Sequence, residues 1–164
     1  MSPSSEIGIY IALGANLGPR AAALSGALQR LAADGDIRVA ACSSFHETDA
    51  VVDDEHDACG SCAPPRFLNA AARLETALPP RELLSRLAAI ESEFGRDRAA
   101  SGVSRSLDLD LLIHHDRQID EPGLCVPHPR MWARAFVLTP LSEIADLDRL
   151  RRFQASLSNR TYPT

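Results

Sequence analysis

The strongest constraint on the fold is an alternation of acidic and apolar residues in segment 107–113, which reads Leu-Asp-Leu-Asp-Leu-Leu-Ile. Successive side chains of an extended strand point to opposite faces. Asp108 and Asp110 would therefore share one face of the strand, while the leucines between and beside them would share the other. This pattern predicts a β-strand that buries one face and presents two carboxylates on the other.

Two acidic side chains on one strand face form a candidate site for divalent metal ions. Their Cα atoms would lie roughly 6.5 Å apart. Both carboxylates could then meet one Mg²⁺ or bridge two ions about 3.5–4 Å apart, the spacing that clamps a polyphosphate. Arg96, Arg98 and Arg105 lie just upstream and would supply phosphate ligands. Ordinary surface acids on a solvated strand give the same Asp-x-Asp pattern, so the assignment depends on the surrounding motifs.

Length and charge limit the class of protein. The chain has 164 residues, and we expect one domain over residues 1–164 with its core over about 7–146. No apolar stretch approaches the ~20 residues that span a bilayer, and residues 1–6 have no basic segment typical of a secretory signal. We therefore expect a cytoplasmic protein that binds no membrane. The net charge of −5 argues against a nucleic-acid partner.

The chain contains no lysine, and all 17 of its basic residues are arginine. This composition excludes a P-loop lysine, a Schiff-base lysine and a lysine general base. A bound phosphate would have to be held by arginine, histidine, backbone amides or a metal ion. Arginine suits that task because its planar guanidinium binds phosphate oxygens in pairs.

The four cysteines do not indicate a disulfide framework in a chain of this size without a secretory signal. Cys59 and Cys62 have CxxC spacing and His56 lies nearby, so a zinc site is conceivable. A tetrahedral zinc site needs a fourth ligand, and no second CxxC follows. A surface loop that happens to carry two free thiols is the simpler interpretation.

Hydrophobic periodicity predicts four strands and three helices. The strands are expected over residues 7–13, 37–47, 67–74 and around the two aspartates. One helix should begin at Pro19 and stop near Gly35, a second should follow Pro79 and end at Gly95, and a short third should cover residues 134–144. The order of the first six elements, β-α-β-β-α-β, is typical of a ferredoxin-like α+β sandwich with two helices on one face of an antiparallel sheet.

The remaining segments carry weaker patterns. Residues 49–65 and 96–104 are predicted loops, and residues 125–129 are a turn or an extended piece. No structure is assigned to the polar tail over residues 149–164. His114 and His115 follow the acidic strand, match no site, and are expected on the surface.

Six segments in one order resemble the motifs of the 6-hydroxymethyl-7,8-dihydropterin pyrophosphokinase family. They extend from about residue 7 to residue 144. They are Gly14-Ala-Asn16-Leu-Gly18, Ser43-Ser-Phe45-His-Glu-Thr48, Phe67-Leu-Asn69-Ala-Ala71, Ile90-Glu91 through Gly95-Arg96-Asp-Arg98, Arg105-Ser-Leu-Asp108-Leu-Asp110, and Val126-Pro-His128 to Arg134-Ala-Phe136.

The resemblance implies transfer of pyrophosphate from ATP to the hydroxymethyl group of 6-hydroxymethyl-7,8-dihydropterin, with release of AMP, two Mg²⁺ ions as cofactors and a place in folate biosynthesis. It implies that Asp108 and Asp110 hold the metal ions and that Arg96, Arg105 and Asp110 act in catalysis. The implied ATP-binding residues are Glu91, Arg96, Arg98, Arg105, His128 and Arg134, and the implied pterin-binding residues are Thr48, Phe67, Asn69 and Phe136.

Several positions depart from the family pattern. Ala15 replaces a serine of the first glycine motif, and Asp49 replaces a proline before an enlarged loop over residues 49–65. The loop between Arg98 and Arg105 lacks a tryptophan that is frequent in the family. Cys125 and Pro129 replace the threonine and tyrosine that flank the Pro-His pair.

These departures leave two alternatives to an active pyrophosphokinase. One is a catalytically impaired paralogue that still binds pterin or ATP. The other is a ferredoxin-like interaction module whose Cys59 and Cys62 loop binds zinc or a partner. The acidic surface and the habit of the family favour a monomer or a weak dimer.

Overall fold

The computed structural model describes residues 7–49, 66–95 and 106–158. A central antiparallel sheet has the strand order β2-β4-β1-β5, with β3 paired to β4 beyond the end of β2. If β2 and β3 are counted as the single strand that the sequence predicts, this is the strand order of the ferredoxin-like sandwich. The predicted α+β class is therefore confirmed. The strands are β1 (Ile9–Ala15), β2 (Ile37–Cys42), β3 (His46–Asp49), β4 (Arg66–Thr76) and β5 (Asp108–His114).

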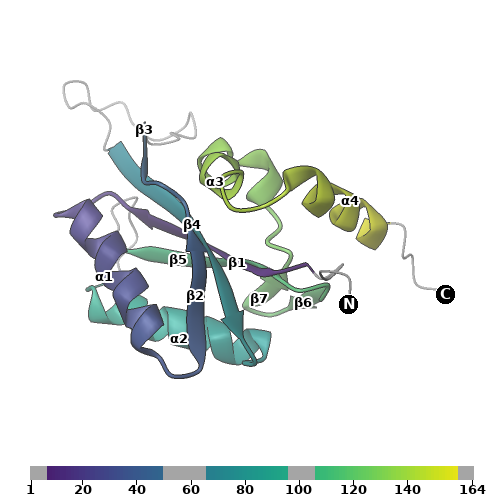
Figure 1. Ribbon diagram of the computed structural model, residues 1–164, viewed down its shortest axis with the longest axis horizontal. Coiled ribbons are helices and arrows are strands. Elements are labelled where there is room, and N and C mark those ends of the chain that lie inside the picture. The colour runs from purple at the N-terminus through teal and green to yellow at the C-terminus, as the bar shows by residue number, and fades with distance from the viewer. Residues whose placement is uncertain (1–6, 50–65, 96–105, 159–164) are drawn as a thin grey trace.

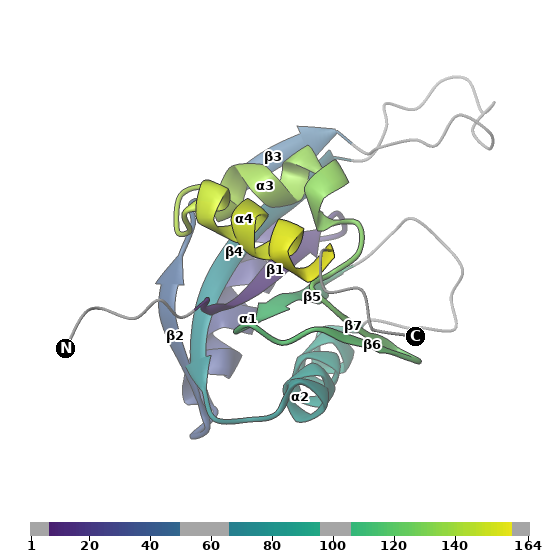
Figure 2. The same ribbon diagram turned by 90° about the vertical axis from the view of Figure 1, so that its right-hand side faces the viewer.

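Helices cover both faces of the sheet (Figure 1). The first face packs against α1 (Arg20–Ala33) and α2 (Pro80–Glu93), as predicted. The second face packs against α3 (Ala135–Leu141) and α4 (Leu147–Ser158), which follow the 3₁₀ turn η1 (Met131–Ala133) (Figure 2). A two-stranded hairpin of β6 (Ile119–Glu121) and β7 (Leu124–Val126) lies between β5 and η1 in the chain.

The larger core lies between the sheet and the α1 and α2 helices. Alternate residues of β1, β4 and β5 enter it, and each helix contributes leucines at helical spacing. On β5 these are Leu109 and Leu111, preceded by Leu107, so the aspartates between them must face the other side of the sheet. The core therefore fixes the direction of both carboxylates.

The predicted strand over residues 37–47 is two strands, β2 and β3. At the break, the Ser43 hydroxyl accepts a hydrogen bond from Ala71 N (2.9 Å), while Ser43 N donates to Ala71 O (2.9 Å). A side-chain oxygen thus replaces a backbone carbonyl in the ladder, and the next strand restarts at His46. The chain bends at this corner, and both β2 and β3 still pair with β4.

His114 is buried, with 3% of its surface exposed, so the expected surface position is wrong. The register of β5 against β1 shifts between Leu111 and Ile113, which leaves Leu112 as one extra residue. This bulge reverses the alternation, and His114 turns inward to bond its Nε2 to Leu78 O (3.0 Å). His115 is partly exposed.

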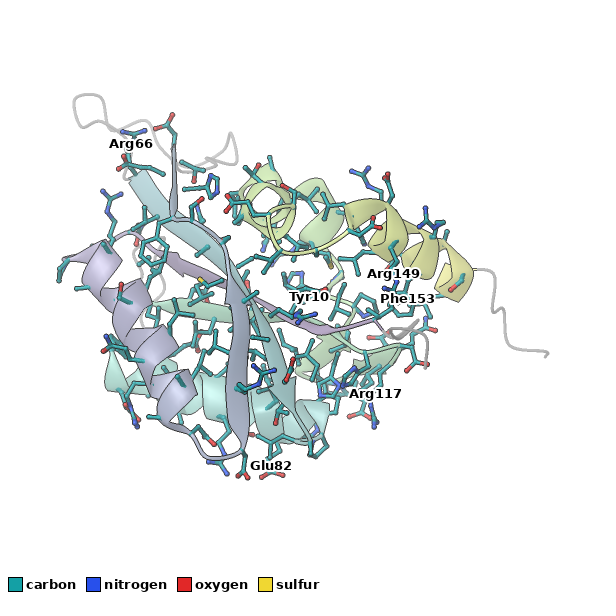
Figure 3. All side chains as sticks on the ribbon, in the orientation of Figure 1. Tyr10, Arg66, Glu82, Arg117, Arg149 and Phe153 are labelled. Carbon is teal, nitrogen blue, oxygen red and sulfur yellow. The ribbon has the colours of Figure 1, made fainter. Side chains whose placement is uncertain are left out.

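The tail is also more ordered than predicted, because α4 occupies much of it. Leu150, Phe153 and Leu157 follow helical spacing, and Leu150 and Leu157 are buried. Phe153 of α4 and Tyr10 of β1, both labelled in Figure 3, belong to the same hydrophobic cluster on the second face of the sheet. The packed body therefore extends to residue 157, beyond the predicted limit near 146.

Other expectations fall outside the described residues. These include most of the loops over 49–65 and 96–104 and the CxxC pair. Cys42 and Cys125 are free thiols, as expected. Within the described ranges, no helix combines the length and apolar character needed to cross a membrane.

Gly26 lies inside α1, where glycine costs about 1 kcal/mol relative to alanine. A Cβ at this position would lie 2.8 Å from the ring of Phe94, which follows α2. We expect Gly26→Ala to lower the free energy of unfolding by roughly 1 kcal/mol, because overpacking outweighs the gain in helix propensity. In a Phe94→Leu background the same substitution should be stabilising, as measured by urea unfolding.

Gly35→Ala is the matched control, since its Cβ would meet nothing within 4 Å. It should leave stability unchanged or raise it in both backgrounds. Equal effects of Gly26→Ala with and without the Phe94 ring would contradict the packing explanation.

Candidate active site

The strand register aligns polar residues across the second face of the sheet. Asp108 lies opposite Gly14 of β1, Gly14 lies opposite Asn69 of β4, and Asn69 lies opposite His46 of β3. Asp110 begins a parallel row through Ala12 and Ala71. We call the small residues Ala12, Gly14 and Ala71 on this face the floor of the site. The carboxylates of β5 lie to one side of this floor, and the Asn69 amide of β4 lies to the other.

The floor residues project little from the sheet, because glycine has no side chain and alanine has only a methyl group. Asp108 and Asn69 are two strands apart, which corresponds to about 10 Å. A Cβ on Gly14 would lie 3.3 Å from Asn69 Oδ1, so even alanine would press on the amide. The glycine of the first motif thus keeps the space beside the Asn69 amide open.

The amide side contains three of the four predicted pterin residues. Asn69 is buried, and its Nδ2 donates a hydrogen bond to Thr48 Oγ1 (2.8 Å). Thr48 lies opposite Phe67 in the register of β3 and β4. This group sits near the end of β4 that Arg66 marks in Figure 3, far from Glu82 at the start of α2.

The fourth residue, Phe136, reaches the same face from α3. This helix packs against β4 and β3. Phe136 is partly exposed, and the Arg134 guanidinium carbon lies 5.5 Å from its ring centroid, a cation–π arrangement. The helix therefore places an aromatic ring and a positive charge above the sheet.

His128 lies next to the carboxylates. Its backbone N–H donates to Leu112 O (2.8 Å), and its ring Nδ1 accepts from Arg130 N (3.2 Å). Burial lowers the pKa of the imidazole, Asp110 acts in the opposite direction, and Arg134 lowers it further. The neutral ring would carry its proton on Nε2, so this nitrogen can donate to an anion.

A pocket of about 340 Å³ opens beside β5, under α2 and the β6–β7 turn. Asp110 contributes to its wall, so the pocket adjoins the acidic pair. Glu91 also contributes, but it is only 1% exposed and its Oε1 accepts a hydrogen bond from Leu109 N (2.7 Å). The full lining is Leu84, Ser85, Ala88, Glu91, Leu109, Asp110 and Gly123.

The structure thus brings the described candidate residues onto one face or into the adjoining pocket. Arg96, Arg98 and Arg105 lie outside the described residues, so their roles stay predictions. No group of three metal-ligating side chains occurs within residues 7–49, 66–95 and 106–158. The acidic pair is the candidate for a metal that keeps other oxygen ligands.

Sequence reasoning missed Glu143, which follows α3. Its carboxylate accepts hydrogen bonds from Ser44 N (2.8 Å) and Ser44 Oγ (2.7 Å) and contacts His46 Nε2. The sequence pattern gave no signal for it, because its partners Ser44 and His46 lie almost 100 residues away in the chain. The pKa of Glu143 is lowered to about 2, first by the Ser44 backbone N–H and then by the hydroxyl and His46.

Comparisons with known proteins agree with this arrangement. The family model for 7,8-dihydro-6-hydroxymethylpterin-pyrophosphokinase (HPPK) matches residues 10–146. The chain is 41% identical over 145 residues to a 2-amino-4-hydroxy-6-hydroxymethyldihydropteridine pyrophosphokinase of Synechocystis, covering 87% of this chain and 69% of the relative. It is 42% identical over 135 residues to the Bacillus subtilis protein of that name, covering 82% and 76%.

A plant relative places a similar sequence within a longer protein. The mitochondrial folate synthesis bifunctional protein of Arabidopsis thaliana is 42% identical over 142 residues, which is 86% of this chain and 24% of the relative.

The lowered pKa of Glu143 predicts an acid-dependent contribution to stability. Its usual pKa is 4.5, so the contribution is complete above that pH and disappears as the pH falls toward 2. Wild type should melt at a higher temperature than Glu143→Gln at pH 5.5, and the gap should narrow progressively toward pH 3. A gap that stays constant over this range would contradict the assignment.

Proposed function

Because the chain belongs to the 7,8-dihydro-6-hydroxymethylpterin-pyrophosphokinase family, we propose that it transfers pyrophosphate from ATP to the hydroxymethyl group of 6-hydroxymethyl-7,8-dihydropterin. The predicted enzyme class, an ATP-dependent diphosphotransferase of folate synthesis, is confirmed by family membership. The interaction module is not favoured, because the family model and the relatives that match this chain are pyrophosphokinases. A catalytically impaired paralogue is the alternative that an activity assay must exclude.

One observation carries the proposal at the level of residues. The two carboxylates of β5 and the Asn69 amide face the same side of the sheet, separated by a floor of glycine and alanine. This arrangement suits a ligand whose one edge needs hydrogen bonds and whose other end must reach a metal-bound polyphosphate. A reduced pterin with a hydroxymethyl arm is such a ligand.

Asp108 and Asp110 would hold two Mg²⁺ ions. Mg²⁺ is bound through one or two carboxylates together with phosphate oxygens and water, so a site with two protein acids fits its preference. When bound, the ions would neutralise the charge that develops on the transferred group. The partial exposure of both aspartates leaves access for phosphate.

The pterin would bind on the amide side of the floor. Asn69 is suited to its amide edge, because one Asn side chain donates and accepts at once. The hydrogen bond to Thr48 fixes the orientation of that amide. Phe67 and Phe136 would contact the two faces of the ring, a use that suits flat aromatic side chains.

ATP would occupy the side of the acidic pair. We assign the base and ribose to the pocket that Glu91 lines, where this buried carboxylate also holds β5 in place. His128 and Arg134 would bind phosphate oxygens, joined by Arg96, Arg98 and Arg105. The neutral His128 ring would act as a hydrogen-bond donor through Nε2.

The reaction then needs positioning more than covalent chemistry. The pterin hydroxyl oxygen bonds to the β-phosphorus of ATP, the bond from that phosphorus to the α–β bridging oxygen breaks, and AMP leaves with this oxygen. The hydroxyl proton passes to Asp110 or to water. Arg96 and Arg105 would stabilise the charge on the transferred group.

The proposed function predicts AMP release that depends on both substrates. Purified protein with ATP and MgCl₂ should form AMP only when 6-hydroxymethyl-7,8-dihydropterin is added, as measured by chromatography. Excess EDTA should stop the reaction, and added Mg²⁺ should restore it. Binding of ATP or the pterin without AMP formation would favour the impaired paralogue.

Asp110→Asn should lower kcat by about 100-fold or more, because an amide keeps the shape but loses the charge that holds the metal. Asp116→Asn is the control, since Asp116 lies in the exposed turn after β5 and outside the site. Both variants should retain the wild-type circular dichroism spectrum. A near-normal rate for Asp110→Asn would refute the metal assignment.

A further inference from the structure

Glu143, in the turn that follows α3, is hydrogen-bonded to the corner between β2 and β3. Both of its oxygens accept hydrogen bonds, from Ser44 N and Ser44 Oγ at 2.7–2.9 Å, and one of them contacts His46 Nε2. The partners are separated by 97 to 99 residues in the sequence. This set of contacts, which we name the Glu143 clasp, therefore joins two distant segments of the fold.

The clasp exists because of the strand break. Ser43 bonds to Ala71 through both its backbone N and its hydroxyl, so the ladder to β4 is completed one residue before Ser44. Ser44 N is thereby left to point away from the ladder, and Glu143 supplies its acceptor. The charge on the acceptor makes these hydrogen bonds stronger than neutral ones.

The residues at each end of the Glu143 clasp lie close in the chain to residues of the proposed pterin site. His46 lies opposite Asn69 in the strand register, and Thr48, two residues further along β3, accepts the hydrogen bond of the Asn69 amide. At the other end, Glu143 lies within the turn that follows α3, and α3 carries Phe136. The clasp thus sets the separation between the hydrogen-bonding edge of the site and one of its aromatic faces.

We propose that Glu143 is a positioning residue for the pterin: without touching it, the carboxylate holds β3 and α3 at the spacing that lets Thr48, Asn69 and Phe136 bind the ring together. The inference rests on the proposed function and deepens it. A ring between these elements is bound well only if hydrogen bonds and stacking are satisfied at once. ATP binds beside β5, so its affinity should not depend on the clasp.

A purely structural role makes a different prediction. Glu143 would then contribute only to folding, and its loss would lower the melting temperature without separating the two substrates. Kinetic constants for each substrate distinguish the two cases, since positioning acts on pterin alone.

The test compares Glu143→Ala with Glu93→Ala. Glu93 is also a partly exposed glutamate near a helix end, and it makes a two-bond ion pair with Arg30 that joins α2 to α1 on the other face of the sheet. We expect Glu143→Ala to raise KM for the pterin about tenfold, while KM for ATP is unchanged. Glu93→Ala should change neither constant, although both variants lose the hydrogen bonds of a carboxylate that joins two segments of the chain. Glu143→Gln keeps an acceptor for Ser44 N and should fall between wild type and Glu143→Ala.

The outcomes separate this inference from the proposed function. Pterin-dependent AMP release by wild type, together with an unchanged KM for the pterin in Glu143→Ala, would overturn the positioning role alone. An equal rise of both KM values in Glu143→Ala would also overturn it, because the effect would not be confined to the pterin. Absence of pterin-dependent AMP release in wild type would refute the proposed function, and the inference would fail with it.

Discussion

The pairing of β1 with β4 on one side and β5 on the other is the constraint on which the site depends. One face of these strands supplies the leucines and isoleucines of the larger core, so the other face receives Asp108, Asp110 and Asn69. A slip of one residue would bury the carboxylates among leucines, at a cost far above that of any local contact. The same hydrophobic packing that stabilises the sheet therefore also aligns its polar residues.

Much of this arrangement was predictable because it depends on local periodicity. The alternation around Asp108 and Asp110 predicts their common face, and the leucines of α1 and α2 predict two amphipathic helices. What escaped prediction depends on contacts between distant segments. The hydroxyl of Ser43 interrupts a strand only because Ala71 is there to bond with it, and the bulge at Leu112 that buries His114 has no signature in the residues themselves.

The candidate site likewise contains residues that the sequence predicts and one that depends on contacts between distant segments. The resemblance to a known family predicted which residues touch a ligand, and the structure brings the described ones to one face and its adjoining pocket. It did not identify Glu143, whose role arises from bonds to Ser44 and His46 almost 100 residues away. The helix α4 was missed because its apolar residues, Leu147, Leu150, Phe153 and Leu157, are few and stand amid polar ones.

Glu91 has a further consequence for how copies of the chain behave in solution. Edge strands expose unpaired backbone donors that can recruit a strand from another molecule and start aggregation. β5 ends the main sheet on one side, yet its Leu109 N–H is already bonded to the buried carboxylate of Glu91. A foreign strand would have to displace this hydrogen bond and separate the Leu109 N–H from its buried acceptor. The Glu91 carboxylate thus disfavours self-association along β5, the edge strand whose acidic pair must remain accessible to solvent.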